Sequence, residues 1–179
     1  ERILILVPDS LQYQWMIEMR RRFNLEFSLF DLTRTASIKE HDPDLNPFLT
    51  EQKIIASVDL MVDHEDLREQ ALEAGFDLLV VDEAHHLMWS EEEGGNDRYD
   101  LVEELAEHTP GVLLLTATPE QLGVESHFAR LRLLDPQRFN SLDRFLDEEA
   151  QYQHTAKIAE VLMSDMPLEA EHFAAIETL

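Results

Sequence analysis

Residues 76–82, FDLLVVD, form a short run of mostly aliphatic side chains that ends in a carboxylate. A solid aliphatic run of this length is typical of a strand that is buried on both faces of a parallel sheet. A second acidic residue and two histidines follow, so that Asp82, Glu83, His85 and His86 stand together just after the strand. Working residues of open parallel sheets lie beyond the carboxyl ends of the strands, and we expect these side chains there.

Similar patterns predict the rest of the fold. The other predicted strands are residues 2–7, 26–31, 53–58 and 112–118. Helical patterns cover residues 11–23, 59–75, 97–109, 126–134 and 141–164, with a last amphipathic piece after Pro167. Strands that alternate with helices predict an α/β fold, an open parallel sheet flanked by helices, with a helical C-terminal segment. Residues 32–50, which hold two prolines and no clear period, and the acidic stretch 90–98 are predicted to be loops.

The first predicted helix carries Leu11, Trp15, Met19 and Phe23 at four-residue intervals. This spacing predicts a single apolar stripe that faces the sheet. We therefore interpret Trp15 as a core residue rather than as a platform on which a base stacks. The cluster Arg20–Arg22 lies at the end of the helix, where complementing the helix dipole is favoured over binding phosphate.

Composition limits the classes of function. The chain has 179 residues, 44% of them hydrophobic and 29% charged, which is ordinary for a soluble globular domain. Its 38 acidic and 14 basic residues give a net charge of −24, which argues against a large DNA-binding face on this chain alone and favours a solvated acidic surface. Cysteine is absent, so disulfides and thiolate metal sites are excluded and a reducing, cytoplasmic location is expected. No apolar run approaches the roughly 20 residues of a membrane helix, so no membrane partner is expected.

Two adjacent carboxylates at a strand end suit phosphoryl transfer. Asp82 can hold Mg²⁺, mostly through water, because Mg²⁺ keeps several waters and takes one or two protein carboxylates. Glu83 can polarise an attacking water. The alternative is that both residues are merely a polar exit from the strand. His85 and His86 are not expected to share a metal ion, since neighbouring residues point apart and no HExxH spacing exists; His86 is expected to be a packed or partly exposed neighbour.

Longer stretches resemble a known family of enzymes. VVDEAHHL and LLLTATP are similar to motifs II and III of superfamily 2 helicases and translocases. ILILVPDSLQYQWMIEM resembles motif Ia of the Swi/Snf-type branch, and IIASVDLM stands where motif Ib is expected. LRLLDPQRFNSLDRFLDE resembles the segment that follows motif III in that branch. The sequence is especially similar to bacterial members of this branch that associate with RNA polymerase.

This resemblance implies a fold and an activity. Residues 1–149 would form part of a RecA-like ATP-binding lobe of the P-loop NTPase type, truncated, and residues 150–179 a helical extension. ATP and Mg²⁺ would be the cofactors, and double-stranded DNA and RNA polymerase the partners. The parent protein would be an ATP-dependent DNA translocase that promotes recycling of RNA polymerase in transcription.

The resemblance also implies roles for individual residues. Asp82 would serve Mg²⁺ and Glu83 the hydrolytic water, within a nucleotide-binding box that includes Ala84. His85 would contact the γ-phosphate side or link the box to motif III. Thr116 and Thr118 would couple the nucleotide state to the grip on nucleic acid. Positions that touch the nucleic-acid backbone in this branch match Pro8, Asp9, Ser10 and Ser57.

One part of the family pattern is not found. The phosphate-binding loop G-x-x-x-x-G-K-[ST] needs a lysine after glycine, whereas Lys39, Lys53 and Lys157 follow other residues. In the family this loop precedes motif Ia, so we expect it upstream of this chain; a divergent relative without the loop is the alternative. Without that anchor for the phosphates, the chain alone is expected to bind ATP negligibly and to hydrolyse none.

Two further expectations concern the chain as a whole. A competing hypothesis is a non-enzymatic module that docks a partner through its acidic surface and keeps only a relic of the box. The segment after residue 150, cut from its neighbours, can expose apolar surface and pair with a second copy of the chain.

Overall fold

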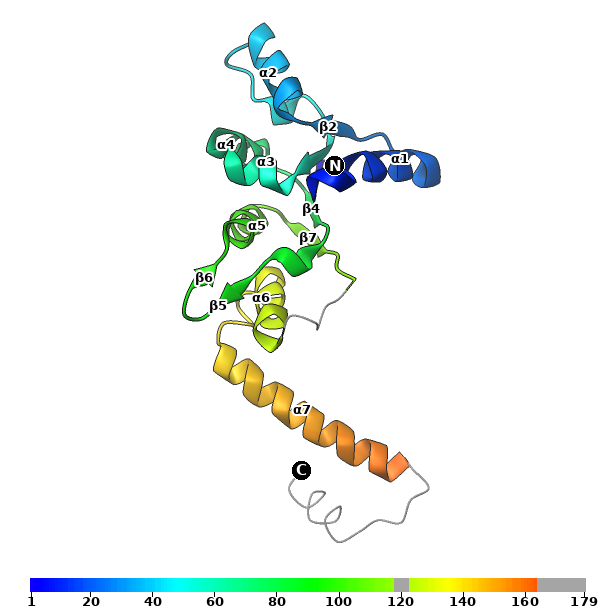
Figure 1. The fold of residues 1–179 in the computed structure, drawn as a ribbon, viewed down its shortest axis with the longest axis vertical. Helices are drawn as coiled ribbons and strands as arrows, with labels where there is room; N and C mark the ends of the chain where they lie inside the picture. Colours follow the sequence, from blue (N-terminus) through cyan, green and yellow to red (C-terminus); the bar gives the residue numbers. More distant parts are fainter. Residues whose placement is uncertain (118–122, 164–179) are drawn as a thin grey trace. The chain divides into compact units, whose positions relative to one another are not determined.

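The computed structural model describes residues 1–117 and 123–163. Contacts within the chain divide it into two units, residues 1–138 and residues 139–179. The strands described below belong to the first unit (Figure 1). Two predictions fall outside the described residues, namely the placement of Thr118 and the amphipathic piece after Pro167.

The first unit is built on a five-stranded sheet whose strands are all parallel. The order β2-β3-β1-β4-β7 joins Ser28–Phe30, Lys53–Ser57, Ile3–Val7, Leu78–Val81 and Gly111–Leu114. Parallel neighbours need crossover connections, which here contain the helices. The predicted α/β class and open parallel sheet are confirmed.

Helices separate the strands along the chain. They are α1 (Gln12–Phe23), α2 (Leu32–His41), α3 (Val58–Asp63), α4 (Glu65–Ala74), α5 (Asp97–Glu107) and α6 (Val124–Leu134). Three short 3-10 helices are η1 (Asp9–Leu11), η2 (Pro47–Leu49) and η3 (Ala84–His86). A small antiparallel hairpin pairs β5 (Trp89–Ser90) with β6 (Gly94–Gly95). Ser90 and β6 fall in the stretch 90–98 that was predicted to be an acidic loop, so the prediction was wrong for these residues. Strands of two residues are too short to show a pattern in the sequence.

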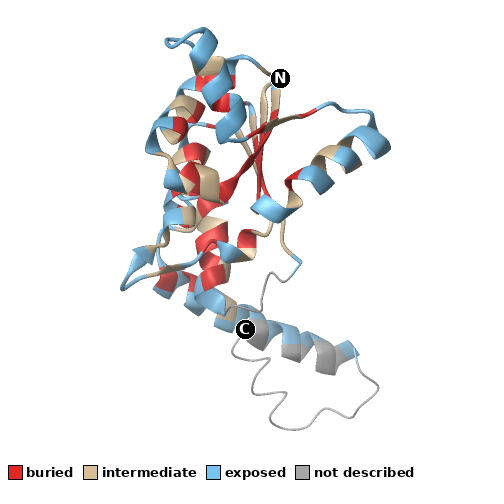
Figure 2. Ribbon diagram, turned by 45° about the horizontal axis from the view of Figure 1, so that its top comes forward, coloured by how far each residue is buried: buried red, intermediate tan, exposed pale blue. Residues whose placement is uncertain are grey.

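The side chains of the sheet alternate between two apolar clusters. In β1, Leu4 and Leu6 belong to the larger cluster, together with residues of α3, α4, α5 and α6. Ile5 and Val7 belong to the second cluster, where Leu11, Trp15, Met16 and Met19 supply the helical cover. Figure 2 shows α1 on the opposite side of the sheet from the other helices of this unit.

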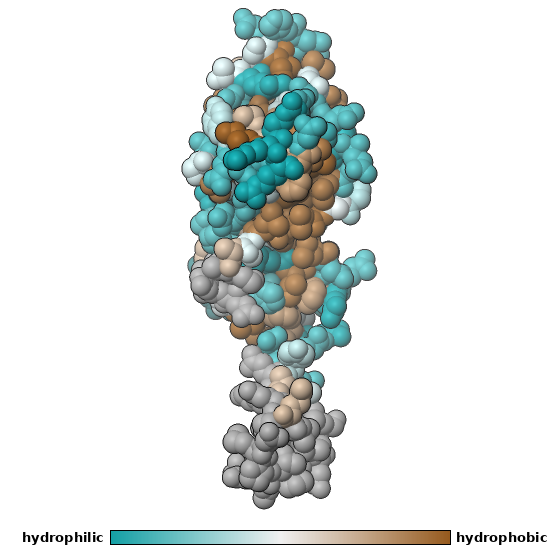
Figure 3. Space-filling model, turned by 90° about the vertical axis from the view of Figure 1, so that its right-hand side faces the viewer, coloured by the Kyte–Doolittle hydropathy of each residue, from teal (hydrophilic) through white to brown (hydrophobic). Residues whose placement is uncertain are grey.

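The second face of the sheet is only partly covered. Ile5 and Val80 are buried there, whereas Leu113 of β7, beside Val80 in register, is 47% exposed. Figure 3 views the molecule from this side and shows apolar side chains gathered at the surface.

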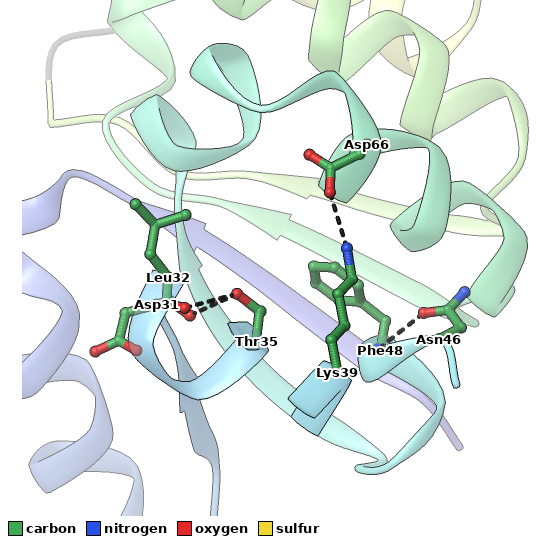
Figure 4. Close-up of polar contacts among 7 residues, drawn as sticks. All are labelled: Asp31, Leu32, Thr35, Lys39, Asn46, Phe48 and Asp66. Atoms are coloured by element: carbon green, nitrogen blue, oxygen red, sulfur yellow. Dashed lines mark hydrogen bonds and ion pairs between the residues drawn. The ribbon is translucent and has the colours of Figure 1, made fainter. Parts of the chain in front are cut away.

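Residues 32–50 were predicted to be a loop, and the structure corrects this to α2 and η2. The Asp31 side chain caps α2 by accepting the Arg34 backbone N–H at 2.8 Å. The Thr35 hydroxyl donates to the carbonyls of Asp31 and Leu32 at 3.0 and 3.1 Å (Figure 4). The helix packs little apolar surface, mainly Ile38, on the core. A helix held by caps and polar contacts carries no apolar period for sequence reasoning to detect.

The same region is attached to the rest of the unit by polar contacts. Lys39 Nζ of α2 lies 2.8 Å from Asp66 Oδ2 of α4 (Figure 4). Asn46 Oδ1 accepts the Phe48 backbone N–H at 2.9 Å, and Asn46 Nδ2 donates to the Gln70 carbonyl at 2.7 Å. Phe48 is thereby inserted into the larger cluster, with its ring centroid 5.4 Å from that of Phe30.

Two further predictions about helices need correction. The helix predicted over residues 59–75 is two helices, because His64 adopts extended backbone (φ −130°, ψ 90°) between α3 and α4. The predicted stop at Gly75 is confirmed, since this residue closes α4 in the left-handed conformation (φ 65°). Phe23 was placed on the buried stripe of α1 but is 62% exposed, because α1 ends there and Asn24 turns the chain away at φ 54°.

The second unit is described for residues 139–163. It contains α7 (Leu142–Met163), in agreement with the helix predicted over residues 141–164. The Phe139 and Phe145 rings pack edge to face with centroids 6.0 Å apart. The predicted boundary at residue 149 falls inside α7. Among the described helices of the chain, none has the length and apolar character needed to cross a membrane.

Replacing Phe48 with alanine is expected to lower the free energy of unfolding by about 3–5 kcal/mol, because a fully buried ring would leave a cavity. Phe23→Ala is the matched control and is expected to change stability by less than about 0.5 kcal/mol, since that ring is exposed. Urea unfolding of both variants measures the difference. Equal losses would contradict the described packing.

The Lys39–Asp66 pair predicts a pH dependence. The hydrogen bond from Lys39 is the main cause that lowers the pKa of Asp66 below its ordinary value of 3.8. A lowered folded-state pKa stabilises the fold above the unfolded-state pKa, and this contribution is lost as the pH falls through the lower value. Exposed pairs contribute less than about 1 kcal/mol, so Lys39→Ala should lower the free energy of unfolding by this amount at neutral pH and not at all below the folded-state pKa of Asp66. Urea titrations against pH check this, and Asp66→Asn should remove the same pH-dependent difference.

Candidate functional site

The candidate site lies at the carboxyl edge of the sheet. Leu6 is in register with Val81, and Val81 with Leu114, so the residues just beyond them share one edge. Asp82 follows β4, and Thr116 follows β7 two residues after its last paired residue. The strand register therefore places Asp82, Glu83 and Thr116 at the same edge of the sheet, as predicted.

The Asp82 carboxylate is held by two donors. Its backbone N–H extends the pairing of β4 by donating to the Leu6 carbonyl at 2.9 Å. Oδ1 accepts the Glu83 backbone N–H at 2.8 Å, and Oδ2 accepts the indole Nε1–H of Trp15 at 2.7 Å. Each carboxylate oxygen keeps a further lone pair, because an ionised carboxylate offers about four acceptor positions.

Glu83 has a strained backbone conformation. It lies in the left-handed region (φ 52°, ψ 42°), which non-glycine residues seldom adopt. The turn directs the next residue toward β7, where the Ala84 N–H donates to the Leu115 carbonyl at 2.8 Å. The His86 N–H then donates back to the Glu83 carbonyl at 3.0 Å within η3. The backbone strain at Glu83 is therefore maintained by pairing on both sides of it.

The histidines of the box lie close together. His85 Nδ1 is 3.0 Å from Glu83 Oε2, although the two groups are not aligned as a hydrogen bond. The His85 and His86 ring centroids are 4.0 Å apart, so the expectation that the side chains point apart was wrong. The tight 3-10 turn of η3 brings successive side chains together. Partial burial of the His86 ring, followed by the effect of His85, lowers the pKa of His86.

The box is also connected to α5. Asn96 caps this helix by accepting the Tyr99 N–H at 2.9 Å, and its side-chain amide donates to the His86 carbonyl at 3.0 Å. Tyr99 is fully buried, and desolvation raises its pKa to about 12. A helix anchored in the core thus fixes the far side of η3.

The other predicted site residues are distributed along the same edge. Ala84 is fully buried under the turn, and Thr116 is half-buried. Pro8 is half-buried, whereas Asp9 and Ser10 are exposed, and the three residues form the turn between β1 and α1. Ser57, beside Val7 in register, is only 2% exposed, and its Oγ is buried without a hydrogen-bond partner in the described structure. Of these residues, Asp9 and Ser10 are the exposed ones.

Sequence reasoning missed Trp15 as a member of the site. The four-residue spacing placed it in the core, and half of that interpretation holds, because its ring packs on the second cluster. The missing signal is chemical: the indole N–H of a packed tryptophan usually finds an acceptor. No spacing rule connects residue 15 with residue 82, so only the fold brings them together.

The donor set suits Mg²⁺ held through one carboxylate. Mg²⁺ takes one or two protein carboxylates together with water and substrate phosphates, and Asp82 retains free lone pairs for that task. Within residues 1–117 and 123–163, no group of three or more acidic, histidine or cysteine side chains forms a complete metal cage. Lys39 is paired with Asp66 of α4, and Lys53 opens β3 at the amino end of the strand, opposite to this edge.

A parallel α/β sheet with an Asp–Glu pair at the end of a central strand is the arrangement of a helicase-like ATPase lobe. The chain belongs to the SNF2-related domain family, whose model matches residues 1–166. It is 55% identical over 172 residues to the RNA polymerase-associated protein RapA of Pasteurella multocida, covering 95% of this chain and 18% of the relative. The protein of the same name from Cronobacter sakazakii is 51% identical over 179 residues, covering 100% of this chain and 18% of that relative. The chain therefore spans less than a fifth of the length of these curated relatives.

Glu83→Gly is expected to raise the free energy of unfolding by about 1 kcal/mol, because glycine adopts the left-handed conformation without the Cβ clash. Glu83→Gln keeps the Cβ and is the matched control, with no change expected. Urea unfolding at neutral pH measures both. A loss of stability in the glycine variant would mean that the Glu83 side chain contributes more than its backbone costs.

Proposed function

We propose that this chain is part of the first motor lobe of an ATP-dependent double-stranded DNA translocase that binds RNA polymerase and promotes its recycling in transcription. The main support is the position of Asp82 and Glu83 at the carboxyl edge of the sheet, where two hydrogen bonds orient the Asp82 carboxylate. The chain also belongs to the SNF2-related domain family. The names of the relatives at 51–55% identity support RNA polymerase as the partner.

Asp82 and Glu83 divide the work at the nucleotide. Asp82 would bind Mg²⁺ with the free lone pairs of a carboxylate whose orientation is already fixed by two donors. Glu83, whose carboxylate lies 3.0 Å from His85 Nδ1, would accept a proton from the attacking water. Mg-ATP would supply the phosphoryl group whose transfer to water drives translocation. Ala84 would serve as the buried backbone link between the two carboxylates and β7.

The flanking residues would connect the nucleotide to nucleic acid. His85, near the Glu83 carboxylate, would act on the γ-phosphate side or toward the segment after β7. Thr116 and Thr118 would couple the state of the bound nucleotide to the binding of nucleic acid. Asp9 and Ser10, in the exposed turn after Pro8, would contact the nucleic-acid backbone, and Ser57 would need its edge to open to do so.

We also propose that residues 1–149 act as a lobe that needs a phosphate cradle from outside this chain. Of the lysine side chains that the structure describes, Lys39 is paired with Asp66 and Lys53 stands at the amino end of β3. Without a lysine or glycine-rich turn opposite Asp82, phosphate groups have no strong anchor here. The isolated chain would therefore not hydrolyse ATP.

Glu83→Gln in the full-length protein is expected to lower the rate of ATP hydrolysis by about 10²- to 10⁴-fold, because the amide cannot accept the proton of the attacking water. Steady-state phosphate release with saturating Mg-ATP and double-stranded DNA measures the effect.

Glu92→Gln is the matched control, since Glu92 lies exposed in the turn between β5 and β6 and should leave the rate unchanged. Activity that survived Glu83→Gln would favour the competing hypothesis of a non-enzymatic acidic module.

A further inference from the structure

The contact between Trp15 and Asp82 joins two parts of the chain that serve different tasks. Trp15 lies in the first turn of α1, which follows the Pro8–Ser10 turn through η1. Its indole Nε1–H donates to Asp82 Oδ2 at 2.7 Å, across 67 positions of sequence. The ring itself is half-buried and packs on the second apolar cluster.

The geometry of Asp82 shows what this bond contributes. The Glu83 N–H binds Oδ1 from the neighbouring residue and by itself restrains one oxygen. The indole N–H binds the other oxygen, so that the plane of the carboxylate is fixed at both ends. Indole nitrogen is a donor only, whereas a side chain such as glutamine could turn and present an acceptor. Trp15 can therefore act only as a donor in this contact, and Asp82 Oδ2 is its acceptor.

Packing alone does not require a tryptophan at this position. Leu11, Met16 and Met19 supply apolar surface to the same cluster, and phenylalanine could fill much of the same space. What phenylalanine lacks is the N–H. The matched substitution Trp15→Phe therefore separates the hydrogen bond from most of the packing.

We propose that Trp15 is a positioning residue, which orients the Asp82 carboxylate for Mg²⁺ and connects the Pro8–Ser10 turn to the metal site. This inference rests on the proposed function of Asp82. Gln12 strengthens the connection, because its side-chain amide donates to Asp9 Oδ1 at 2.6 Å and ties the turn to the first turn of α1. A displacement of the turn would move Trp15 relative to Asp82.

The hydrogen bond itself can be tested in this chain without nucleotide. The chain has two tryptophans, so a ¹⁵N–¹H spectrum should show two indole signals. Trp15→Phe assigns one of them, and Trp89, which packs on Phe128, supplies the internal reference. Asp82→Ala should shift the Trp15 signal and speed its exchange with solvent, while Asp44→Ala, at an exposed residue between α2 and η2, should leave that signal in place. If Asp82→Ala changes neither the chemical shift nor the exchange rate of the Trp15 indole signal, the proposal is overturned.

The positioning role is tested in the full-length protein. Trp15→Phe should raise the Mg²⁺ concentration for half-maximal ATP hydrolysis by about tenfold, the lower end of the effect of losing a partner of a metal ligand. Trp89→Phe is the matched control and should leave this concentration unchanged. An unchanged Mg²⁺ midpoint in Trp15→Phe overturns the positioning role.

The two proposals fail in different ways. Hydrolysis that survives Glu83→Gln contradicts the proposed function, whereas the indole spectrum still reports on the Trp15–Asp82 bond. Loss of hydrolysis in Glu83→Gln together with an unchanged Mg²⁺ midpoint in Trp15→Phe leaves the proposed function intact and overturns only the role of Trp15.

Discussion

The pairing of β4 with β1 on one side and β7 on the other is the constraint on which the site depends. The Asp82 N–H continues the pairing to β1 through Leu6, and the Ala84 N–H reaches β7 through Leu115. The residue between them, Glu83, has to bridge two different strands in one step. Its left-handed backbone is the conformation that satisfies both hydrogen bonds. The strain at Glu83 is thus a direct result of placing the box at the centre of a parallel sheet.

The carboxylates are positioned by secondary structures on both faces of the sheet. On one face, α5 is anchored by the buried Tyr99 and holds η3 through Asn96. On the other face, α1 carries the indole that binds Asp82. Two layers that share no side-chain cluster therefore converge on one short turn. Such convergence favours a single geometry for Asp82 and the turn after it, because each is restrained from a separately packed helix.

The negative charge of the chain bears on what the carboxylates of the site can bind. A net charge of −24 gives the molecule as a whole a field that repels polyanions such as DNA and nucleotides. The carboxylates of the site add to that field unless cations stand opposite them. Under the proposed function, Mg²⁺ would offset the negative charge of this pair.

Periodicity and residue chemistry by themselves determined the parallel sheet, because strands such as Leu78–Val81 are aliphatic on both faces. They also determined that Asp82 and Glu83 stand at its carboxyl edge. They did not reveal α2, whose stability comes from Asp31, Thr35 and Lys39 rather than from an apolar stripe. The exposure of Phe23, the burial of Ser57 and the bond from Trp15 to Asp82 were decided only by the tertiary structure. Local patterns report which face of an element is apolar, whereas a contact between residues 67 positions apart exists only once the sheet has brought their elements together.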